Sequence, residues 1–374
     1  MRILVTGGIG FIGSHVVGDL LGAGHEVRVI DLLDSQVHGE DHIPQLDPRV
    51  KFFHGDINDP DCLVQALDGC EAVAHLAATV GVGQSMYEVT YYTHANVNGT
   101  ACLYETLIKN RKRFPVKKVV VASSMSAYGE GLYRCDGCDC ALRGRPRPVE
   151  QLKARRWEPE CPNCRKALKP MPVPETEPFM CESIYALTKR DTEEIALMLG
   201  KSHGIATMAL RFFNVYGPGQ SLSNPYTGVA AIFISRILNR HAPVVYEDGL
   251  QSRDFVHVRD VARAVRLALE SKDGDMVLNV GANRPVTILE VAQIILNLSG
   301  ATGPVPCATQ TYRFGDIRHC FADISRIRKL LGWRPEVSIE DGFRELMDWS
   351  GTVKAVDRFD QATKELERYG LLNS

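Results

Sequence analysis

The sequence has no run of about 18 uninterrupted apolar residues, so we expect no membrane-spanning helix. It also lacks a large net charge of either sign, because 43 Lys and Arg against 45 Asp and Glu leave only −2. That balance excludes a general attraction for nucleic acid or anionic lipid. The first residues, MRILVTGGIGFIG, form a short apolar run broken by glycines, which favours a β-strand over a signal peptide. We expect a cytoplasmic globular protein with no nucleic-acid and no membrane partner.

Short apolar runs alternate with helical patterns over the first 130 residues. The runs RILVTG, EVRVID, AVAHLAA and KVVVASS are separated by segments such as Phe11–Ala23 and Asn96–Asn110 that have helical periodicity. Near-continuous Val, Ile and Ala runs are typical of parallel strands buried on both faces. The sequence therefore predicts an α/β fold with a Rossmann-type doubly wound parallel sheet.

Composition divides the chain into four parts. Five cysteines and eight prolines between Gly129 and Phe179 mark an insertion with little apolar periodicity. Irregularly mixed strands and helices in the last third indicate a smaller lobe that closes over a ligand. The expected parts are a dinucleotide-binding Rossmann domain (1–130 and 180–220), a cysteine-rich insertion (131–179), a smaller α/β substrate lobe (mainly 221–350, with a return to the first domain near 251–275) and a helical tail (351–374).

The first strand ends in TGGIGFIG, which places Gly7, Gly10 and Gly13 where a strand turns into a helix. Glycines at such a turn let a pyrophosphate approach backbone N–H groups at the positive end of a helix dipole. Asp31 closes the second strand, 18 positions after Gly13. A carboxylate there accepts hydrogen bonds from an adenosine ribose and repels a 2′-phosphate, so the predicted cofactor is NAD rather than NADP.

Tyr185 and Lys189 are four residues apart in YALTK and share one face of a predicted helix. A free tyrosine has a pKa of about 10 and is a poor base near neutrality. A neighbouring ammonium and the positive ring of an oxidised nicotinamide would stabilise the phenolate and lower that pKa. The pair is therefore a candidate general acid/base.

The motifs TGGIGFIG, HLAA, NVNGT, SSMSAYG, YALTK, RFFNVYGPGQ and RDFVHVRDVARA follow one another along the chain. In this order and spacing the sequence resembles the extended short-chain dehydrogenase/reductase family of nucleotide-sugar epimerases and dehydratases. The resemblance covers nearly the whole chain except the insertion. It implies that Ser124, Tyr185 and Lys189 are catalytic.

The same resemblance implies the remaining binding residues. The residues expected at NAD are Gly7, Gly10, Phe11, Ile12, Gly13, Asp31, Asp56, Ile57, Leu76, Ala77, Ala78, Asn96, Ser123, Tyr185, Lys189 and Val215. The residues expected at the substrate are Ser85, Ser124, Ser126, Asn214, Arg253 and Arg318. For Ser126, a role as a helper at the reacting sugar and a role as an ordinary strand-end serine are equally supported.

The reaction implied by the family is transient oxidation of a sugar at C4, followed by hydride return to the opposite face. In the similar dehydratases an Asp-Glu pair follows the catalytic Ser or Thr, but here Met125 and Ser126 stand at those positions, which disfavours dehydration. The insertion, with SQVHGE and GVGQSMYE, resembles that of the dTDP-L-rhamnose 4-epimerase subgroup, whose members interconvert dTDP-L-rhamnose and dTDP-6-deoxy-L-talose. A UDP-sugar 4-epimerase, a net 4-ketoreductase or dehydrogenase, and a non-catalytic NAD-binding scaffold remain as alternatives.

Cys135 and Cys138 form one Cys-x2-Cys pair, and Cys161 and Cys164 form another. Two such pairs supply four thiolates at the corners of a tetrahedron, as in zinc ribbons. The binding energy of structural zinc could fold an insertion with so little core, and the alternative is a disordered loop with reduced thiols. We expect a structural zinc ion and an insertion that borders the sugar pocket or a subunit contact. The family also implies a homodimer built on the helices around 96–110 and 184–200.

Overall fold

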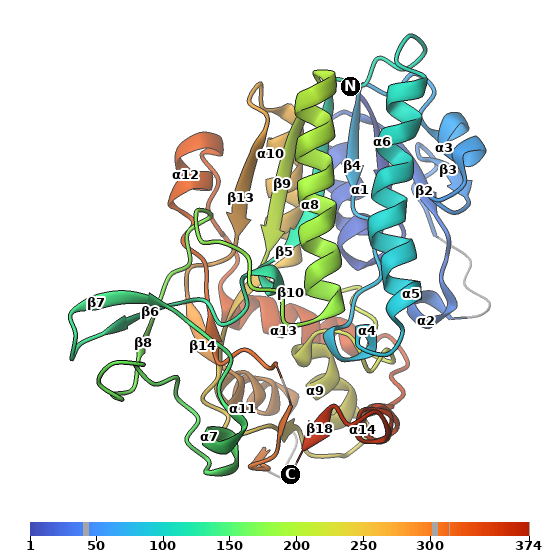
Figure 1. Cartoon of the computed structure of the whole chain (residues 1–374). Helices are drawn as coiled ribbons and strands as arrows, with labels where there is room; N and C mark the ends of the chain where they lie inside the picture. The colour runs from blue at the N-terminus through green and yellow to red at the C-terminus, as the bar shows by residue number, and fades with distance from the viewer. Residues whose placement is uncertain (40–44, 301–305, 314, 374) are drawn as a thin grey trace.

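A computed structural model describes residues 1–39, 45–300, 306–313 and 315–373. Its centre is a seven-stranded sheet in which every strand pair is parallel. The strands in spatial order are β13 (Met276–Val280), β9 (Ala206–Phe212), β5 (Lys118–Ser124), β4 (Ala72–His75), β1 (Arg2–Thr6), β2 (Glu26–Asp31) and β3 (Lys51–His54). The predicted doubly wound parallel sheet is confirmed (Figure 1).

Helices cover both faces of the sheet, and each face has its own apolar core. One face packs against α1 (Phe11–Gly22), α10 (Val258–Glu270) and α12 (Ser325–Leu331). The other packs against α3 (Pro60–Ala66), α6 (Gly99–Lys109) and α8 (Ile184–His203). The strands are buried on both sides for this reason: all seven residues of β5 are buried, which explains its nearly unbroken apolar sequence.

Helix α8 shows how local sequence sets the ends of an element. It begins after Ser183, whose side chain accepts the Ala186 N–H, and it ends at Gly204, which adopts a left-handed φ of 65°. The helix expected around 96–110 is divided: a π-helical segment η1 (Thr93–Asn98) precedes α6. A π-helical turn often marks a functional position, and this one carries Asn96.

The smaller lobe lies beyond the carboxyl ends of the strands (Figure 1). Its own sheet joins β10, β12, β14 and β17, and helices α9, α11 and α13 form its core. The bounds in this lobe are β10 (Asn214–Tyr216), α9 (Val229–Leu238), β11 (Val244–Val245), β12 (Ser252–His257), β14 (Pro285–Thr287), α11 (Ile288–Ser299), β15 (Cys307–Ala308), β16 (Tyr312–Arg313), β17 (His319–Cys320), α13 (Ile339–Ser350), α14 (Phe359–Arg368) and β18 (Leu372–Asn373). The chain returns from this lobe to the large sheet through α10 and β13.

The insertion forms a small sheet that projects to one side of the molecule (Figure 1). Its antiparallel strands run in the order β7-β6-β8. The elements are β6 (Leu132–Cys135), β7 (Cys140–Arg143), α7 (Val149–Lys153) and β8 (Lys169–Met171). The short segments α2 (Ser35–His38), α4 (Val82–Ser85), α5 (Val89–Tyr92) and the 3-10 turn η2 (Met125–Tyr128) complete the structure.

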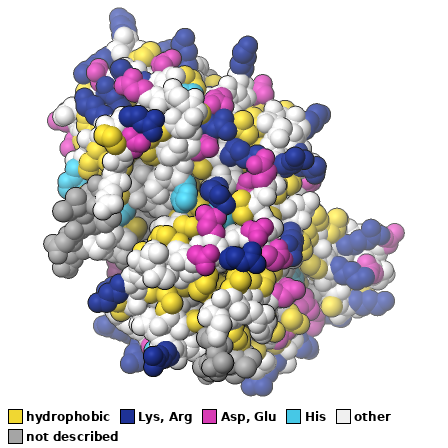
Figure 2. Space-filling view, turned by 180° about the vertical axis from the view of Figure 1, so that it is seen from behind, with side chains coloured by type: hydrophobic (Ala, Val, Ile, Leu, Met, Phe, Trp, Pro, Cys, Tyr) yellow, Lys and Arg dark blue, Asp and Glu magenta, His cyan; other side chains and the backbone are white. Residues whose placement is uncertain are grey.

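The surface matches the balanced composition. Basic and acidic side chains are interspersed over the face shown in Figure 2, with apolar side chains between them. Among the described residues, no helix is both long enough and apolar enough to cross a membrane.

Candidate active site

A cavity of about 920 Å³ lies between the carboxyl edge of the large sheet and the smaller lobe. Its wall includes the β1–α1 turn, the ends of β2 and β5, the start of α8, and the first turns of α9. The strand order reverses between β1 and β4, and crevices at such a point are where open parallel sheets bind ligands.

The β1–α1 turn is built for close backbone approach. Gly7 has a φ of 71°, and a Cβ on it would lie 2.8 Å from the backbone of Ala77. A Cβ on Gly13 would lie 2.0 Å from the Gly7 carbonyl oxygen. Helix α1 begins at Phe11, after the N-cap residue Gly10, with no side-chain cap and no acidic residue in its first turn, so its N–H groups are available to an anion. The turn therefore fits a dinucleotide pyrophosphate.

Asp31 ends β2 and lines the same cavity. Its Oδ2 accepts the Ile9 N–H at 2.9 Å and its Oδ1 accepts the Leu33 N–H at 2.9 Å. These two bonds orient the carboxylate toward the space beside the glycine turn while leaving lone pairs for ribose hydroxyls. The position suits the adenosine ribose of NAD.

The cavity wall contains most of the residues expected at the cofactor: Gly7, Gly10, Phe11, Ile12, Gly13, Asp31, Asp56, Ile57, Leu76, Ala77, Ala78, Ser123, Tyr185, Lys189 and Val215. Asn96 lies behind it. Its side chain accepts the Thr79 N–H at 2.8 Å and donates to the Thr79 carbonyl and to Thr188 Oγ1. Asn96 therefore supports the 76–79 segment from behind.

Ser124, Tyr185 and Lys189 come together at the end of β5 and the start of α8. Lys189 is only 4% exposed, and its Nζ donates to the Ala122 carbonyl at 3.0 Å. Burial lowers the pKa of Lys189 to about 8. Burial also raises the pKa of Tyr185, and the hydrogen bond between the Ser124 and Tyr185 side chains opposes that rise.

The depressed phenol pKa expected from the sequence is not a property of the protein by itself, because burial dominates there. Ser124 Oγ also lies 2.8 Å from Ser126 Oγ, and both serines line the cavity. The two hydroxyls and the phenol form one hydrogen-bonded group at the cavity wall.

Two residues expected at the substrate lie elsewhere. Ser85 is fully buried; its hydroxyl donates to the Val82 carbonyl at 2.7 Å and accepts the Tyr185 N–H at 3.0 Å. Ser85 therefore lies against the first turn of α8, where it holds the backbone N–H of Tyr185. Arg318 is also fully buried and pairs with carboxylates outside the cavity wall, so it does not present its guanidinium to a ligand there.

Arg253 lines the cavity as expected, and Arg313 joins it there. Asp316 holds both side chains: Arg253 Nη2 lies 3.2 Å from its Oδ1, and Arg313 Nη2 lies 3.0 Å from its Oδ2. Sequence reasoning chose Arg318 from the segment RFGDIR and missed Arg313 and Asp316. The segment offers two arginines, and only the tertiary contacts decide which one faces the cavity.

Three side-chain amide oxygens in the cavity wall are buried with no hydrogen-bond partner among the described residues. They belong to Asn214, Gln220 and Gln251. A buried acceptor without a partner is costly, so these oxygens indicate contacts with a polar ligand. Asn214 was expected at the substrate, whereas the two glutamines were missed because nothing local in the sequence distinguishes them from surface residues.

The four cysteines of the two pairs gather at one end of the insertion. Their four Sγ atoms all lie within 4.8 Å of one another. The Sγ atoms of Cys135 and Cys164 are 3.4 Å apart, and those of Cys138 and Cys161 are 3.8 Å apart. The first cysteine of each pair accepts backbone N–H groups from the second and third residues that follow it. The pairs thus have the same local conformation.

Comparisons with known proteins agree with this geometry. The family model described as the NAD dependent epimerase/dehydratase family matches residues 3–148 and 167–281, and the gap between them falls in the insertion. The dTDP-L-rhamnose 4-epimerase of Burkholderia thailandensis is 34% identical over 93% of this chain and 94% of its own. A putative UDP-glucose 4-epimerase of Methanocaldococcus jannaschii is 31% identical over 93% and 97%.

Solved structures are similar over the same span. The UDP-glucose 4-epimerase of Thermotoga maritima, solved with UDP-glucose, has a TM-score of 0.76 at 32% identity and covers 94% of this chain and 99% of its own. The UDP-glucose 4-epimerase of Thermus thermophilus, solved with NAD, has a TM-score of 0.74 at 30% identity and covers 95% and 100%.

Proposed function

Since the chain belongs to the NAD dependent epimerase/dehydratase family, it is an NAD-dependent sugar-nucleotide epimerase, and we propose that it inverts the C4 configuration of its substrate through a 4-keto sugar. The observation that carries the proposal is the Ser124, Tyr185 and Lys189 group in the wall of a cavity that also holds the glycine turn and the Arg253–Arg313 pair. The residues proposed for hydride transfer and those proposed for diphosphate binding therefore line the same cavity.

NAD, when bound, supplies the hydride acceptor and donor, and the glycine turn with Asp31 would hold it. Tyr185 takes the proton from the C4 hydroxyl and later returns it, with Ser124 orienting that hydroxyl by a hydrogen bond. Lys189, held by the Ala122 carbonyl, places a positive charge near the phenolate. Tyr185 and Ser124 thus act at the oxygen atom on C4, whereas Lys189 acts on the phenolate.

Inversion requires the sugar to turn while the diphosphate stays in place. The ion pairs of Asp316 with Arg253 and Arg313 keep both arginines in the cavity wall. Guanidinium groups suit bidentate contact with phosphate. Asn214, in the same cavity wall, offers an amide oxygen without a partner that can accept from a hydroxyl of the nucleotide or the sugar. This arrangement supports a substrate anchored by its diphosphate and free to turn at its sugar.

The proposed substrate pair is dTDP-L-rhamnose and dTDP-6-deoxy-L-talose. It is supported by the likeness to the Burkholderia thailandensis dTDP-L-rhamnose 4-epimerase over most of both chains. A UDP-sugar is the second candidate, favoured by the similarity to UDP-glucose 4-epimerases. Dehydration is not favoured, since Met125 and Ser126 offer no carboxyl group after Ser124.

The test is a panel of dTDP-, UDP- and GDP-sugars followed by NMR, with purified protein and no added NAD. We expect C4 inversion of the dTDP-6-deoxy sugar without net NADH formation, because the cofactor is regenerated in each turnover. NADH formed in proportion to product would support a dehydrogenase instead. Normal NAD binding without turnover of any sugar would support a scaffold and contradict the proposal.

We also propose that the insertion holds a structural zinc ion on Cys135, Cys138, Cys161 and Cys164. Zinc–sulfur bonds of about 2.3 Å in a tetrahedron put the sulfurs about 3.8 Å apart, close to the 3.4 and 3.8 Å separations of the two measured pairs. Backbone N–H groups donate to the sulfur atoms of Cys135 and Cys161 in the same way, which supports two equivalent ligand positions. The apolar cluster around Tyr133 and Leu168 is small, so a metal would supply much of the stability.

A homodimer formed through α6 and α8 is a further proposal. The two helices pack side by side along one face of the sheet (Figure 1), and Met198 on α8 is 66% exposed. Light scattering should give twice the 41.4 kDa mass of the chain. A monomer at micromolar concentration would contradict this proposal and leave the catalytic one untouched.

A further inference from the structure

The insertion reaches the cavity wall. Pro146, Arg147 and Leu152 line the cavity together with residues of both lobes. Leu152 and Trp157 also pack against Tyr312, the neighbour of Arg313. The insertion is thus in contact with the part of the site that carries the phosphate-binding arginines.

Arg147 joins three segments of the protein. Its Nη1 and Nη2 donate to the two carboxylate oxygens of Glu247 at 2.8 and 2.9 Å. Nη2 also donates to the Asp316 carbonyl at 2.9 Å, and Nη1 donates to the Trp157 carbonyl at 3.0 Å. The side chain is 3% exposed, and its Nε lies 3.5 Å from Glu130. With its donors occupied in this way, Arg147 is placed to hold neighbours rather than ligand.

The segment that Arg147 holds is the one that orients the cavity arginines. The Asp316 carboxylate clamps Arg253 and Arg313. Arg253 also donates to the carbonyls of Ile317 at 2.5 Å and Arg318 at 3.2 Å. A shift of the 316–318 backbone would therefore move both guanidinium groups.

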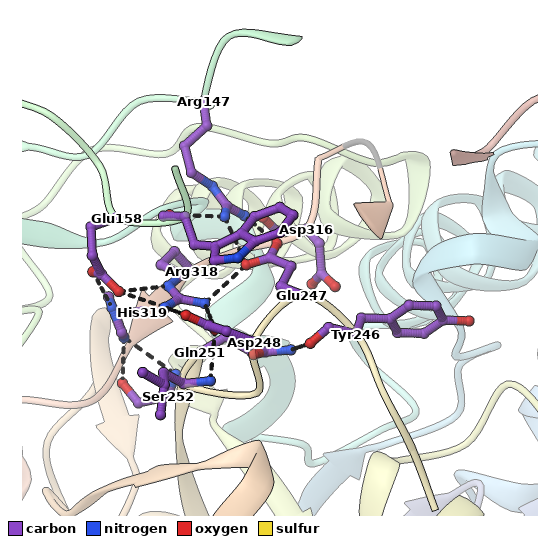
Figure 3. A network of polar contacts seen from close by, with 12 residues as sticks. Arg147, Glu158, Tyr246, Glu247, Asp248, Gln251, Ser252, Asp316, Arg318 and His319 are labelled. Atoms are coloured by element: carbon purple, nitrogen blue, oxygen red, sulfur yellow. Dashed lines mark hydrogen bonds and ion pairs between the residues drawn. The ribbon is translucent and has the colours of Figure 1, made fainter. Parts of the chain in front are cut away.

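Glu247 is the second link in this network. It is 2% exposed and lies between Arg147 and Arg318, whose Nη1 is 3.0 Å from Glu247 Oε2 (Figure 3). Its φ is 54°, a left-handed conformation that favours glycine, so the side chain occupies this position at a conformational cost. Removal of Arg147 would take a buried cation away from both Glu247 and Glu130 beside the cavity.

We propose that Arg147 is a positioning residue for Arg253 and Arg313, so that the insertion is a part of the diphosphate site. The ligand follows from the proposed function: it is the diphosphate of a pyrimidine sugar nucleotide. Arg147 acts through Asp316 and Glu247 and makes no contact with the reacting carbon. Its loss weakens nucleotide binding and leaves NAD binding and the group around Tyr185 intact.

The experiment titrates dTDP and UDP into the NAD-loaded protein by calorimetry, for wild type, Arg147→Met and Arg156→Met. Arg156 is the matched control, because it lies in the same insertion in an exposed ion pair with Glu160. We expect Arg147→Met to weaken nucleotide affinity about tenfold or more, with unchanged NAD content, and Arg156→Met to behave as wild type. With the sugar nucleotide, KM should rise while kcat stays within about threefold.

Unchanged nucleotide affinity in a folded Arg147→Met variant overturns the inference. If that variant does not fold, Arg147→Lys answers the same question, since it keeps the charge and loses the two-pronged contact with Glu247. Affinity equal to wild type in Arg147→Lys, with KM also unchanged, likewise overturns it. A wild type that binds neither nucleotide contradicts the proposed function itself, so the two failures are distinguishable.

Discussion

Tyr185 sits where burial and hydrogen bonding oppose each other. Burial raises its pKa, and the hydrogen bond to Ser124 lowers it. Ser85 holds its backbone N–H, and Ser183 caps the helix that carries it. The phenol is thus placed by contacts on both its backbone and its side chain, and its acidity depends on what occupies the cavity.

Replacing Tyr185 by Phe should therefore lower kcat about 10²- to 10⁴-fold, the usual contribution of a general acid/base. NAD content should stay unchanged, since the ring is preserved. The measurement is the rate of C4 inversion by NMR, with bound NAD quantified by absorbance. Tyr104→Phe is the control, because Tyr104 is a buried tyrosine that bonds Thr207 outside the cavity. Equal rates for Tyr185→Phe and Tyr104→Phe would contradict the assignment.

His75 gives the structure a predictable pH dependence. The Thr100 hydroxyl donates to the Asn96 carbonyl, so it accepts from His75 Nε2 at 3.1 Å, and His75 Nδ1 is left to accept from Thr6 at 2.9 Å. This is a neutral ring. Burial, with a smaller effect from Lys189, lowers the pKa of His75 to about 3.

Between about pH 6.5 and pH 3, His75 is protonated in the unfolded chain, where its pKa is near 6.5, but stays neutral in the folded chain. The free energy of unfolding should therefore fall as the pH falls through that window, by about 1 kcal/mol from about pH 7.5 to about pH 5.5 for this residue. Denaturant titrations of wild type and His75→Gln should differ in this pH dependence. His203→Asn, at the end of α8, serves as control. Parallel curves for wild type and His75→Gln would refute the prediction.

Among the elements, the insertion differs most from the rest of the fold. It has three short strands and a small apolar cluster, and its contacts with the smaller lobe include a buried network of charges. Arg318 is central to that network: it pairs with Glu158 of the insertion and with Glu247 and Asp248 of the lobe (Figure 3). Loss of order in the insertion would leave Arg318 buried with fewer carboxylates.

Changing Cys161 to Ser should abolish zinc binding and lower the thermal midpoint, since one of four thiolates is lost. Elemental analysis should find about one zinc per chain in wild type and far less in the variant. Cys140→Ser is the matched control, because Cys140 lies in the same sheet but outside the cluster. A folded wild type free of metal would refute the zinc proposal.

At the scale of the whole molecule, the C-terminal tail connects the two sides of the cavity. Glu365 on α14 accepts from Tyr87 at 3.0 Å and from Tyr226, and Tyr369 stacks on Tyr87 at 4.4 Å. The following strand β18 pairs with β16, which carries Arg313. Residues of α14, Leu366 among them, line the cavity. The tail is thus a wall of the cavity that is joined to both lobes.

Glu365→Ala should loosen this wall and raise the KM for the sugar nucleotide about fivefold, with a small effect on global stability. Limited proteolysis should cleave the tail of this variant faster than that of wild type. Glu367→Ala, exposed on the same helix, should match wild type in both measurements. No change in KM or in cleavage for Glu365→Ala would show that the tail does not contribute to the site.

The sequence by itself determined the parallel sheet, the glycine turn, Asp31, the Tyr185 and Lys189 pair and the two cysteine pairs, whereas Ser124 came from the resemblance to a known family. These features depend on local spacing: apolar runs predict buried strands, and a strand that ends in glycines fixes where a helix starts. A four-residue spacing places two side chains on one helix face. Such information lies within a few turns of the chain, so it can be read without the fold.

Only the tertiary structure decided which arginine of RFGDIR faces the cavity, that Ser85 supports α8, and that the insertion and the tail reach the site. Arg313 and Arg318 have the same chemistry and lie five positions apart. Their roles differ because Asp316 holds one at the cavity while Glu158, Glu247 and Asp248 enclose the other. These partners come from segments up to 160 residues away, and no local pattern records such contacts.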